Sequence, residues 1–252
     1  MREGGGESVM SRAFRLLDAF ADGSPELTLD ELSQRSGVSR STVHRLAGQL
    51  AERGALERSH RGWRLGTRLF ELGQLVAREQ RLRERALAHM QDLYAATGET
   101  VQLAIADSGT VLYVEIISGH RKVASPSRRG GRMPLHCTAL GKALLAFSAD
   151  AGRDFIASAP PLERRTPQTI VDLDELRAEL RRVRGEQVAY DRQEAAVGLQ
   201  CVAAPILDRA GEASAALSVS MSAGGRLTAA EVAPAVRTVA RAISRDDLTK
   251  RR

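Results

Sequence analysis

The chain has 252 residues, of which 43% are hydrophobic, and its 37 Lys and Arg outnumber its 31 Asp and Glu to give a net charge of +6. This length is enough for two domains with separate cores. No apolar run approaches the roughly 18 residues of a membrane span, and MREGGGESVM at the start lacks the apolar segment of a secretory signal peptide. Two distant cysteines, Cys137 and Cys201, cannot build a disulfide framework. We therefore expect a cytoplasmic protein of two domains that is not associated with a membrane.

An amphipathic helix is predicted near the start of the chain. Apolar residues recur at helical spacing from Val9 to Phe20, and the helix closes at the turn-forming run 22–25. Its apolar face could pack on a domain core or pair with a second copy of the chain, and both alternatives are open at this point.

Two short helices and a tight turn are predicted between residues 28 and 54. Thr28 and Glu31 have the spacing of a capping box, which starts a helix, and Gly37 supplies the left-handed backbone of a sharp turn. Ser39 is the expected N-cap of a second helix, which ends near Arg53. This layout is typical of a helix-turn-helix that enters the major groove of DNA.

The second of these helices has an apolar face and a polar face. Val43, Leu46 and Leu50 recur at steps of three and four residues and form the apolar stripe. The first turn and the opposite face carry basic and polar side chains suited to phosphates and base edges. The predicted DNA-contacting residues of this helix are Ser39, Arg40, Ser41, Thr42, His44 and Arg45.

A basic hairpin is predicted directly after this helix. Residues 56–58 and 63–65 have the pattern of two short strands, and Arg58, Arg61 and Arg64 would line this wing and contact phosphates or the minor groove. Residues 33–68 hold eight Arg against two Glu, a net charge of +6 that equals the charge of the whole chain. A solvated basic surface is the alternative. Because charge, capping and hairpin coincide in one short window, we favour a winged helix-turn-helix.

A linker helix and an α+β domain are predicted for the rest of the chain. Helical spacing continues from residue 67 to 96, and we interpret the charged cluster 78–85, which interrupts it, as the exposed linker between domains. The expected division is a winged helix-turn-helix at 1–66, a linker helix at 67–80 and an effector-binding domain at 81–252. The further predicted elements are strands over 101–105, 111–117, 188–191, 202–207 and 213–220, and helices over 138–147, 172–184, ended by Gly185, and 228–244.

Three segments carry a family resemblance. They are RGWRLGTRL at 61–69, MPLHCTALGKALLA at 133–146 and EAAVGLQCVAAPILDRAGEASAALSVS at 194–220. In this order, after a helix-turn-helix, they resemble the IclR family of bacterial transcription regulators over nearly the whole chain. The resemblance implies a linker helix between the winged helix-turn-helix and a GAF-like α/β effector-binding domain. It further implies a homodimer or homotetramer on a palindromic double-stranded DNA operator. It also implies control by a small metabolite, often an organic or aromatic acid.

An effector pocket in the second domain is also implied by the resemblance. Ser218 and Ser220 are two apart on one predicted strand, so both hydroxyls share a face of the sheet, and residues 139–141 open a helix whose N–H groups favour a carboxylate. An ionised Asp191 would repel an anionic effector, so this residue is expected to bind a hydroxyl, a water molecule or a shared proton. By position in the family motifs, the expected pocket residues are Ser125, Met133, Ala139, Leu140, Asp191, Cys201, Ser218 and Ser220, with Ser125 and Met133 at the rim.

Other interpretations of these residues are open. Cys201 could be only a small buried apolar residue, and Asp191 a strand residue at the surface. His136 and Cys137 beside them suggest a metal site, although no close Cys-x-x-Cys or His-x-x-x-His pair supports one. Hydrolysis is disfavoured because no Gly-x-Ser-x-Gly elbow is present. We expect neither a metal nor a cofactor.

The charge of the preferred ligand is open as well. Gln200 stands where the family often has a basic residue, while the loop before residue 133 is basic, with Lys122, Arg128, Arg129 and Arg132. The sequence thus predicts a DNA-binding regulator controlled by a metabolite and not an enzyme. The alternatives are a metabolite-binding protein or enzyme whose basic N-terminal module serves another purpose, and a nucleoid-type DNA binder without a ligand.

Overall fold

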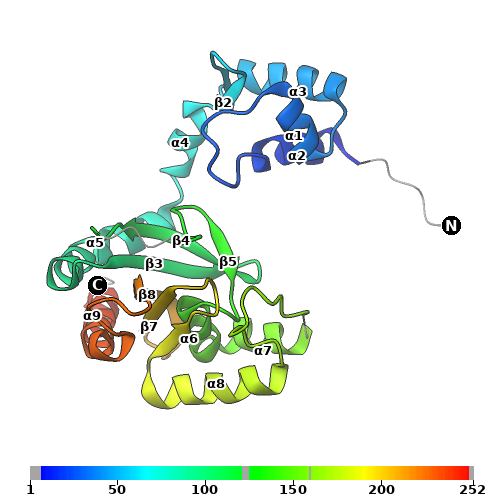
Figure 1. Cartoon of the computed structure of the whole chain (residues 1–252). Coiled ribbons are helices and arrows are strands. Elements are labelled where there is room, and N and C mark those ends of the chain that lie inside the picture. Colours follow the sequence, from blue (N-terminus) through cyan, green and yellow to red (C-terminus); the bar gives the residue numbers. More distant parts are fainter. Residues whose placement is uncertain (1–6, 121–124, 159, 250–252) are drawn as a thin grey trace. The chain divides into compact units, whose positions relative to one another are not determined.

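A computed structural model describes residues 7–120, 125–158 and 160–249 of the chain. The chain divides into two compact units, Met1–Gln80 and Arg81–Arg252 (Figure 1). Each unit contains buried hydrophobic residues that form its own core. Within the described ranges, no helix combines the length and the apolar composition needed to cross a bilayer.

The first unit contains the predicted helix-turn-helix. The Thr28 hydroxyl accepts the N–H of Glu31 at 3.2 Å and the Glu31 carboxylate accepts the N–H of Thr28 at 2.7 Å, which confirms the capping box. Gly37 has φ +64°, the left-handed conformation expected for the turn. The elements are α1 (Val9–Asp18), α2 (Leu29–Ser36), α3 (Arg40–Glu52), β1 (Leu56–Arg58), β2 (Trp63–Leu65) and α4 (Thr67–Gly73).

One core joins α1, α2 and α3 to the β1–β2 hairpin. Leu16 of α1, Leu32 of α2 and Val43 of α3 are fully buried in it, together with Trp63 of β2. Trp63 also exchanges two backbone hydrogen bonds of 2.8 Å with Leu27, a strand pairing that the sequence did not predict. This pairing attaches the hairpin to the segment before α2, so that α3, the predicted recognition helix, and the wing share one rigid support.

Part of the apolar surface of this unit is not covered. Leu16 and Phe20 place one face of α1 in the core, whereas another face of the same helix and the surface of α4 expose large apolar side chains. Phe70 is 70% exposed and Leu75 is 75% exposed. The exposed apolar residues on or beside α1 and α4 are Val9, Met10, Phe14, Phe70, Leu72, Leu75 and Val76.

The linker region differs from the prediction. A break at residues 74–76 separates α4 from α5 (Ala77–Thr97), and the charged cluster 78–85 lies inside α5. The cluster does not interrupt the helix, because Leu82 and Ala86 within and beside it stay buried while the charged side chains lie on other faces. α5 begins in the first unit and continues in the second.

The second unit is built on a six-stranded antiparallel sheet in the order β5-β4-β3-β8-β7-β6. The α+β class is confirmed. The elements after α5 are β3 (Thr100–Asp107), β4 (Thr110–Ile117), β5 (Arg132–Pro134), α6 (Ala139–Phe147), α7 (Ala149–Ser158), α8 (Leu173–Glu186), β6 (Ala189–Arg192), β7 (Leu199–Leu207), β8 (Ala213–Ser222) and α9 (Ala229–Thr249).

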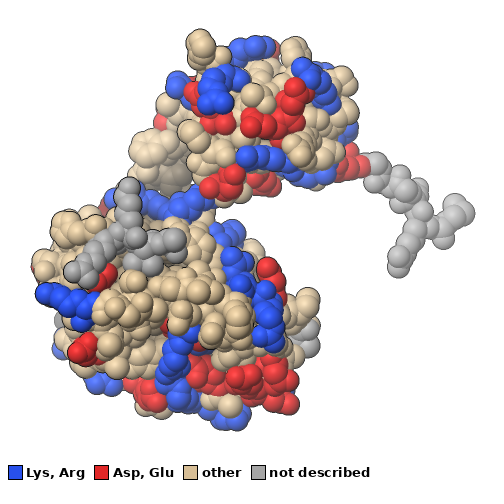
Figure 2. All heavy atoms as spheres, viewed as in Figure 1, with Lys and Arg blue, Asp and Glu red and all other residues tan. Residues whose placement is uncertain are grey.

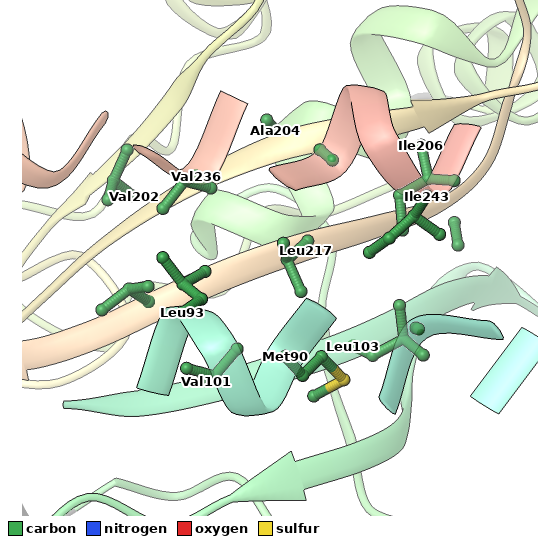
Figure 3. Packing of buried hydrophobic residues seen from close by; sticks show 14 of the residues in the cluster. Met90, Leu93, Val101, Leu103, Val202, Ala204, Ile206, Leu217, Val236 and Ile243 are labelled. Carbon is green, nitrogen blue, oxygen red and sulfur yellow. The ribbon is translucent and has the colours of Figure 1, made fainter. Parts of the chain in front are cut away.

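Helices cover both faces of this sheet. On one face, α5 and α9 pack against alternate strand residues of one buried cluster; Met90 of α5 lies near Leu103, and Val236 of α9 lies beside Val202 (Figure 3). On the other face, α6 packs against the intervening strand residues, such as Ala203, and α8 packs on α6 (Figure 1). The second face is where the sheet carries polar side chains, and the candidate effector cavity lies there.

Several elements differ from the predicted ones. Strand β5 and helix α7 were not predicted, and β7 and β8 are longer than expected. The expected helix end at Gly185 is wrong, because α8 continues to Glu186 and Gln187 takes the left-handed conformation with φ +57°. The N–H of Gln187 donates to the carbonyl of Val183 at 2.8 Å, and its side chain accepts a hydrogen bond from Arg241. These contacts stabilise a helix end without glycine.

Candidate functional site

The polar face of α3 is open to solvent, so a DNA duplex can reach it. Val43 is fully buried and fixes the rotation of the helix. Arg40 forms an ion pair with Asp30 of α2. Ser39 occupies the N-cap position, but its hydroxyl donates to Thr42 Oγ1 at 2.9 Å and caps no backbone N–H. Of the predicted contact residues of α3, Ser39, Arg40, Ser41, His44 and Arg45 are exposed and Thr42 is half-buried.

The wing presents arginines beside the recognition helix. Arg58 stacks over the ring of Trp63, 4.8 Å from its centroid, and Arg61 is exposed at the turn. Arg64 donates to the Glu57 carboxylate at 2.8 Å, and the hydrogen bond from the Thr67 N–H, followed by Arg64, lowers the pKa of Glu57. Because Glu57 offsets the charge of Arg64, Arg58 and Arg61 are the better placed phosphate contacts. The positively charged residues of this unit are all arginines, and on its visible face they are interspersed with acidic residues (Figure 2).

All eight residues of the predicted effector pocket line one cavity in the second unit. The cavity lies between the polar face of the sheet, the start of α6 and the loop before β5. The volume in which the centre of a water molecule fits is about 10 Å³, so the cavity has room for about one water. A ligand with an aromatic ring therefore requires that a wall moves. Six lining residues were not predicted: Gln102, Tyr113, Pro126, Thr138, Ala195 and Leu199.

Gln102 of β3 organises the polar wall of the cavity. Its Oε1 accepts hydrogen bonds from Ser218 Oγ at 3.1 Å and Ser220 Oγ at 2.9 Å, and both serines lie on one face of β8, as their spacing predicts. Its Nε2 donates to Ser127 Oγ at 2.6 Å. Cys201 Sγ lies 3.1 Å from Ser220 Oγ, whose proton already points to Gln102, so the thiol is the donor of that pair. A ligand oxygen that accepts the serine protons competes with Gln102 Oε1 for them.

Asp191 of β6 is a buried carboxyl in the cavity wall. It is 1% exposed, which excludes the surface alternative. Its Oδ1 accepts the N–H groups of Glu194 at 2.7 Å and Ala195 at 3.3 Å. Burial raises the pKa of Asp191 to about 7, despite these hydrogen bonds. The carboxyl therefore carries a proton for much of the time at neutral pH and can donate it to a ligand oxygen.

The N-terminus of α6 points its first N–H groups toward the same wall. Thr138 Oγ1 accepts the N–H of Gly141 at 3.0 Å, and its carbonyl accepts the N–H of Lys142 at 2.9 Å. The N–H groups of Ala139 and Leu140, both at the cavity, are the remaining donors of the first turn. Among the described lining residues there is no Lys or Arg, so this helix end and the neutral form of Asp191 are the features that favour an anion.

A buried lysine lies behind the cavity wall. Lys142 of α6 has 0% exposure, and its Nζ donates to Glu194 Oε1 at 2.7 Å and Glu179 Oε1 at 3.1 Å. Burial would raise the pKa of Glu179, but hydrogen bonds from Arg182 and Lys142 hold it at about 2. Burial does raise the pKa of Glu194, whose Oε2 has no partner among the described residues. This network was not predicted from the sequence; the lone lysine in the apolar run LGKALLA is the sequence feature that could have indicated it.

The residues of the metal alternative are engaged elsewhere. His136 Nε2 lies 3.1 Å from the carbonyl of Glu163, and Cys137 is a fully buried free thiol whose pKa burial raises to about 12. Across the described ranges, no group of three His, Cys, Asp or Glu is arranged to hold a metal ion. Lys122, one of the basic residues noted in the loop, lies outside the described residues.

The geometry defines a class of protein. A solvent-facing recognition helix with a basic wing, in one chain with an α+β unit that encloses a polar cavity, is the arrangement of a ligand-controlled DNA-binding regulator. Two family models match the chain, "IclR helix-turn-helix domain" over residues 9–60 and "Bacterial transcriptional regulator IclR C-terminal" over residues 74–245. The chain belongs to the IclR family of transcriptional regulators.

Known members of the family are similar over most of the chain. The HTH-type transcriptional regulator BhcR of Paracoccus denitrificans is 36% identical over 220 residues, which are 86% of this chain and 78% of the relative. The regulator XynR of Escherichia coli is 32% identical over 213 residues, 84% of each chain. The crystal structure of an IclR homologue from Microbacterium hydrocarbonoxydans, complexed with 4-hydroxybenzoate, has a TM-score of 0.86 at 28% identity and covers 96% of this chain and 100% of that one.

Proposed function

We propose that this regulator binds a palindromic operator with α3 and the β1–β2 wing, and that a small organic acid bound in the cavity of the second unit changes its operator affinity. The observation that supports the proposal most directly is the cavity, since eight residues chosen from sequence motifs line it together. The complex of a relative with 4-hydroxybenzoate makes an aromatic carboxylic acid the first ligand class to test. The role we propose is binding and not catalysis, as in relatives named as transcriptional regulators.

The ligand we propose is an acid that also carries a hydroxyl or carbonyl oxygen. Its carboxylate accepts the N–H groups of Ala139 and Leu140 at the start of α6, where the helix dipole favours negative charge. Its second oxygen meets the hydroxyls of Ser218 and Ser220 or the proton of Asp191. Tyr113, Met133 and Leu199 supply apolar contacts for the carbon frame.

Two copies or four are proposed to form the active assembly. A palindromic operator matches a two-fold dimer whose recognition helices lie about 34 Å apart or a multiple of it. The exposed apolar side chains of α1 and α4 support self-association, because a second copy that packs on them removes apolar surface from water. We propose the domain limits 1–66, 67–80 and 81–252, and a location in the cytoplasm, where the operator lies. Sedimentation of Phe70→Glu against the unchanged chain tests the association.

The DNA-binding proposal is tested with a duplex selected by this chain from a random pool. Arg45→Ala removes a side chain expected at base edges and should weaken binding by about 5- to 150-fold, the equivalent of ~1–3 kcal/mol. Arg226→Ala, an exposed arginine in the second unit, is the control for loss of one positive charge. Unchanged affinity and sequence preference in Arg45→Ala would contradict the assignment of the recognition helix.

The effector site is tested with a thermal-shift screen of small organic acids that includes 4-hydroxybenzoate, because a bound ligand stabilises the fold by mass action. For an acid that binds, the double variant Ser218→Ala with Ser220→Ala should lose the shift and keep its operator affinity. Ser214→Ala, on the same strand but away from the cavity, is the matched control. A double variant that still responds to the acid would refute the pocket.

A further inference from the structure

A buried carboxylate in β4 lies between two arginines from different parts of the second unit. Glu115 is 1% exposed, and its Oε2 binds Arg83 of α5 while its Oε1 binds Arg129 of the loop 125–131. The N–H of Ile116 also donates to Oε1 at 2.9 Å. The β3–β4 register shifts beside this residue, since Leu103 pairs with Glu115 and Ala104 with Tyr113. Such a bulge re-aims a side chain.

The charge of Glu115 is stabilised by these partners. Burial alone would raise the pKa of this carboxyl, but the hydrogen bond from Arg83, the Ile116 N–H and the charge of Arg129 together lower it. A buried carboxylate needs such partners, because removal of one leaves charge in a poorly solvated place. The loop and the helix are therefore joined by a contact that cannot be released without cost.

The loop that carries Arg129 also forms a wall of the effector cavity. Ser125 and Pro126 line the cavity, and Ser127 Oγ accepts the bond from Gln102 Nε2 at 2.6 Å. At its other end, Gly130 N–H donates to the carbonyl of Tyr113 at 2.8 Å. The loop thus touches the cavity at its start and Glu115 at its end. The other walls are strands, the start of α6 and the segment at Ala195, whose apolar lining residues belong to the hydrophobic core, so the loop 125–131 is the wall with the least packing to lose when the cavity opens.

Arg83, on the other side of Glu115, lies in the helix that connects the units. α5 runs from Ala77 to Thr97, and the boundary between the units falls after Gln80, three residues before Arg83. We propose that Glu115 is a positioning residue that couples the loop 125–131 to α5, so that a ligand which displaces the loop also changes the order or position of this helix. The consequence for DNA rests on the function proposed above; the coupling within the second unit does not.

The coupling is tested by amide hydrogen exchange on the full chain, without DNA or effector. Gln102→Ala releases Ser127 and loosens the loop from the cavity side, and we expect exchange of the α5 amides in residues 81–97 to rise several-fold. In an Arg129→Gln background the same change should alter that exchange by less than twofold, because the loop no longer contacts Glu115. In the Arg129→Gln variant, Glu115 keeps Arg83 and the Ile116 N–H as partners, so we expect the fold to persist; Glu115→Gln is the second background.

Asp107→Asn is the matched control, since it removes the exposed Arg132–Asp107 ion pair on the same hairpin and should leave the response of α5 intact. The proposal is overturned if Gln102→Ala has no effect on α5, if its effect persists in both backgrounds, or if Asp107→Asn abolishes it equally.

A second experiment uses 4-hydroxybenzoate or another acid found to bind. The Arg129→Gln chain should bind the acid within twofold of the unchanged affinity, but the acid should no longer change its operator affinity. Loss of ligand affinity would make Arg129 a pocket residue and contradict the positioning role. A chain that fails to bind DNA leaves the exchange result unaffected, so the two proposals fail separately.

Discussion

Asp191 decides which ligand charge the cavity accepts. With burial raising its pKa to about 7 and no Lys or Arg among the described lining residues, the cavity is close to neutral when this carboxyl is protonated. Above pH 7 the carboxylate repels an anion at close range, so an acidic effector is bound best below that pH. Among the lining residues, Asp191 is therefore the group that we expect to dominate the pH dependence of effector binding, with the buried Glu194 and Lys142 beside it.

The same residue should make stability depend on pH in a defined direction. Below pH 3.8 Asp191 is protonated in the folded and unfolded chain alike; as pH rises to about 7 the unfolded form ionises and the folded form does not, so the free energy of unfolding falls. Asp191→Asn removes this loss, which is on the order of 4 kcal/mol for a shift of ~3 pKa units. Urea unfolding of both chains at pH 5, 7 and 8.5 measures it. We expect the stability advantage of the Asp191→Asn chain to grow up to pH 7 and then to level off; a constant difference would contradict the raised pKa.

Lys142 provides a second prediction for a single residue. Lys142→Met fills the same volume but leaves Glu179 and Glu194 facing each other in a buried site, so the free energy of unfolding at pH 7 should fall by about 3–5 kcal/mol. Urea unfolding gives the value. In Lys142→Met with Glu194→Gln, one unpaired charge is removed, and part of the loss should be recovered. A single variant as stable as the unchanged chain would show that the network is solvated.

Single elements show what local sequence can and cannot predict. The helix-turn-helix and the wing were predicted correctly because their determinants are local: a capping box at Thr28, a left-handed turn at Gly37 and a two-strand hairpin. Strand β5 was missed because its three residues form a strand only by pairing with β4; α7, which begins one residue after α6 and packs on it, was missed as well. The end of α8 was placed at Gly185, whereas tertiary contacts of Gln187 set it.

The cavity also shows that local sequence does not predict contacts made by long-range pairing. Its predicted residues came from motifs of the family that the chain resembles, whereas Gln102 and Tyr113 stand in β3 and β4, outside those motifs. Alternation along β3 predicts that Gln102 faces away from Val101 and Leu103, but not that β8 brings two serines to its oxygen. Sheet order, which is a long-range property, creates that contact.

The start of α6 gives a prediction for one element. A Cβ on Gly141 would lie 2.1 Å from the carbonyl oxygen of Leu135, so Gly141→Ala forces the helix start away from that backbone. We expect the free energy of unfolding to fall by about 1–3 kcal/mol and the affinity for an acidic ligand to fall with it, since the N–H groups of Ala139 and Leu140 move. Thermal unfolding and ligand titration measure the two effects.

Gly185 supplies the matched control. It is a helical glycine in α8 with no atom within 4 Å of an added Cβ, so Gly185→Ala should stabilise the chain by about 0.5–1 kcal/mol. The two substitutions are chemically identical and opposite in expected sign. Equal effects would mean that the close approach at Gly141 has no role.

At the scale of the whole molecule, the proposed DNA-contacting face and the cavity lie in different units, and no residue is shared between them. α5 is an element that both units contain, so a change in this helix is one route by which the cavity can influence DNA binding. Thermodynamic linkage sets a strict condition on such a system: if the effector changes operator affinity by a factor, the operator changes effector affinity by the same factor.

This reciprocity is the last prediction. With the selected duplex and an acid that binds, we expect the ratio of operator dissociation constants with and without acid to equal the ratio of acid dissociation constants with and without duplex, and typical coupling free energies of ~1–3 kcal/mol make each ratio about 5 to 150. Calorimetry gives the second ratio and fluorescence anisotropy the first. A scrambled duplex bound through phosphates alone should leave the acid affinity nearly unchanged, because it does not require one fixed placement of the recognition helices. If the operator ratio and the acid ratio differ beyond error, the acid acts at a second site or through the state of association. If acid binds and both ratios equal one, the cavity does not control DNA binding.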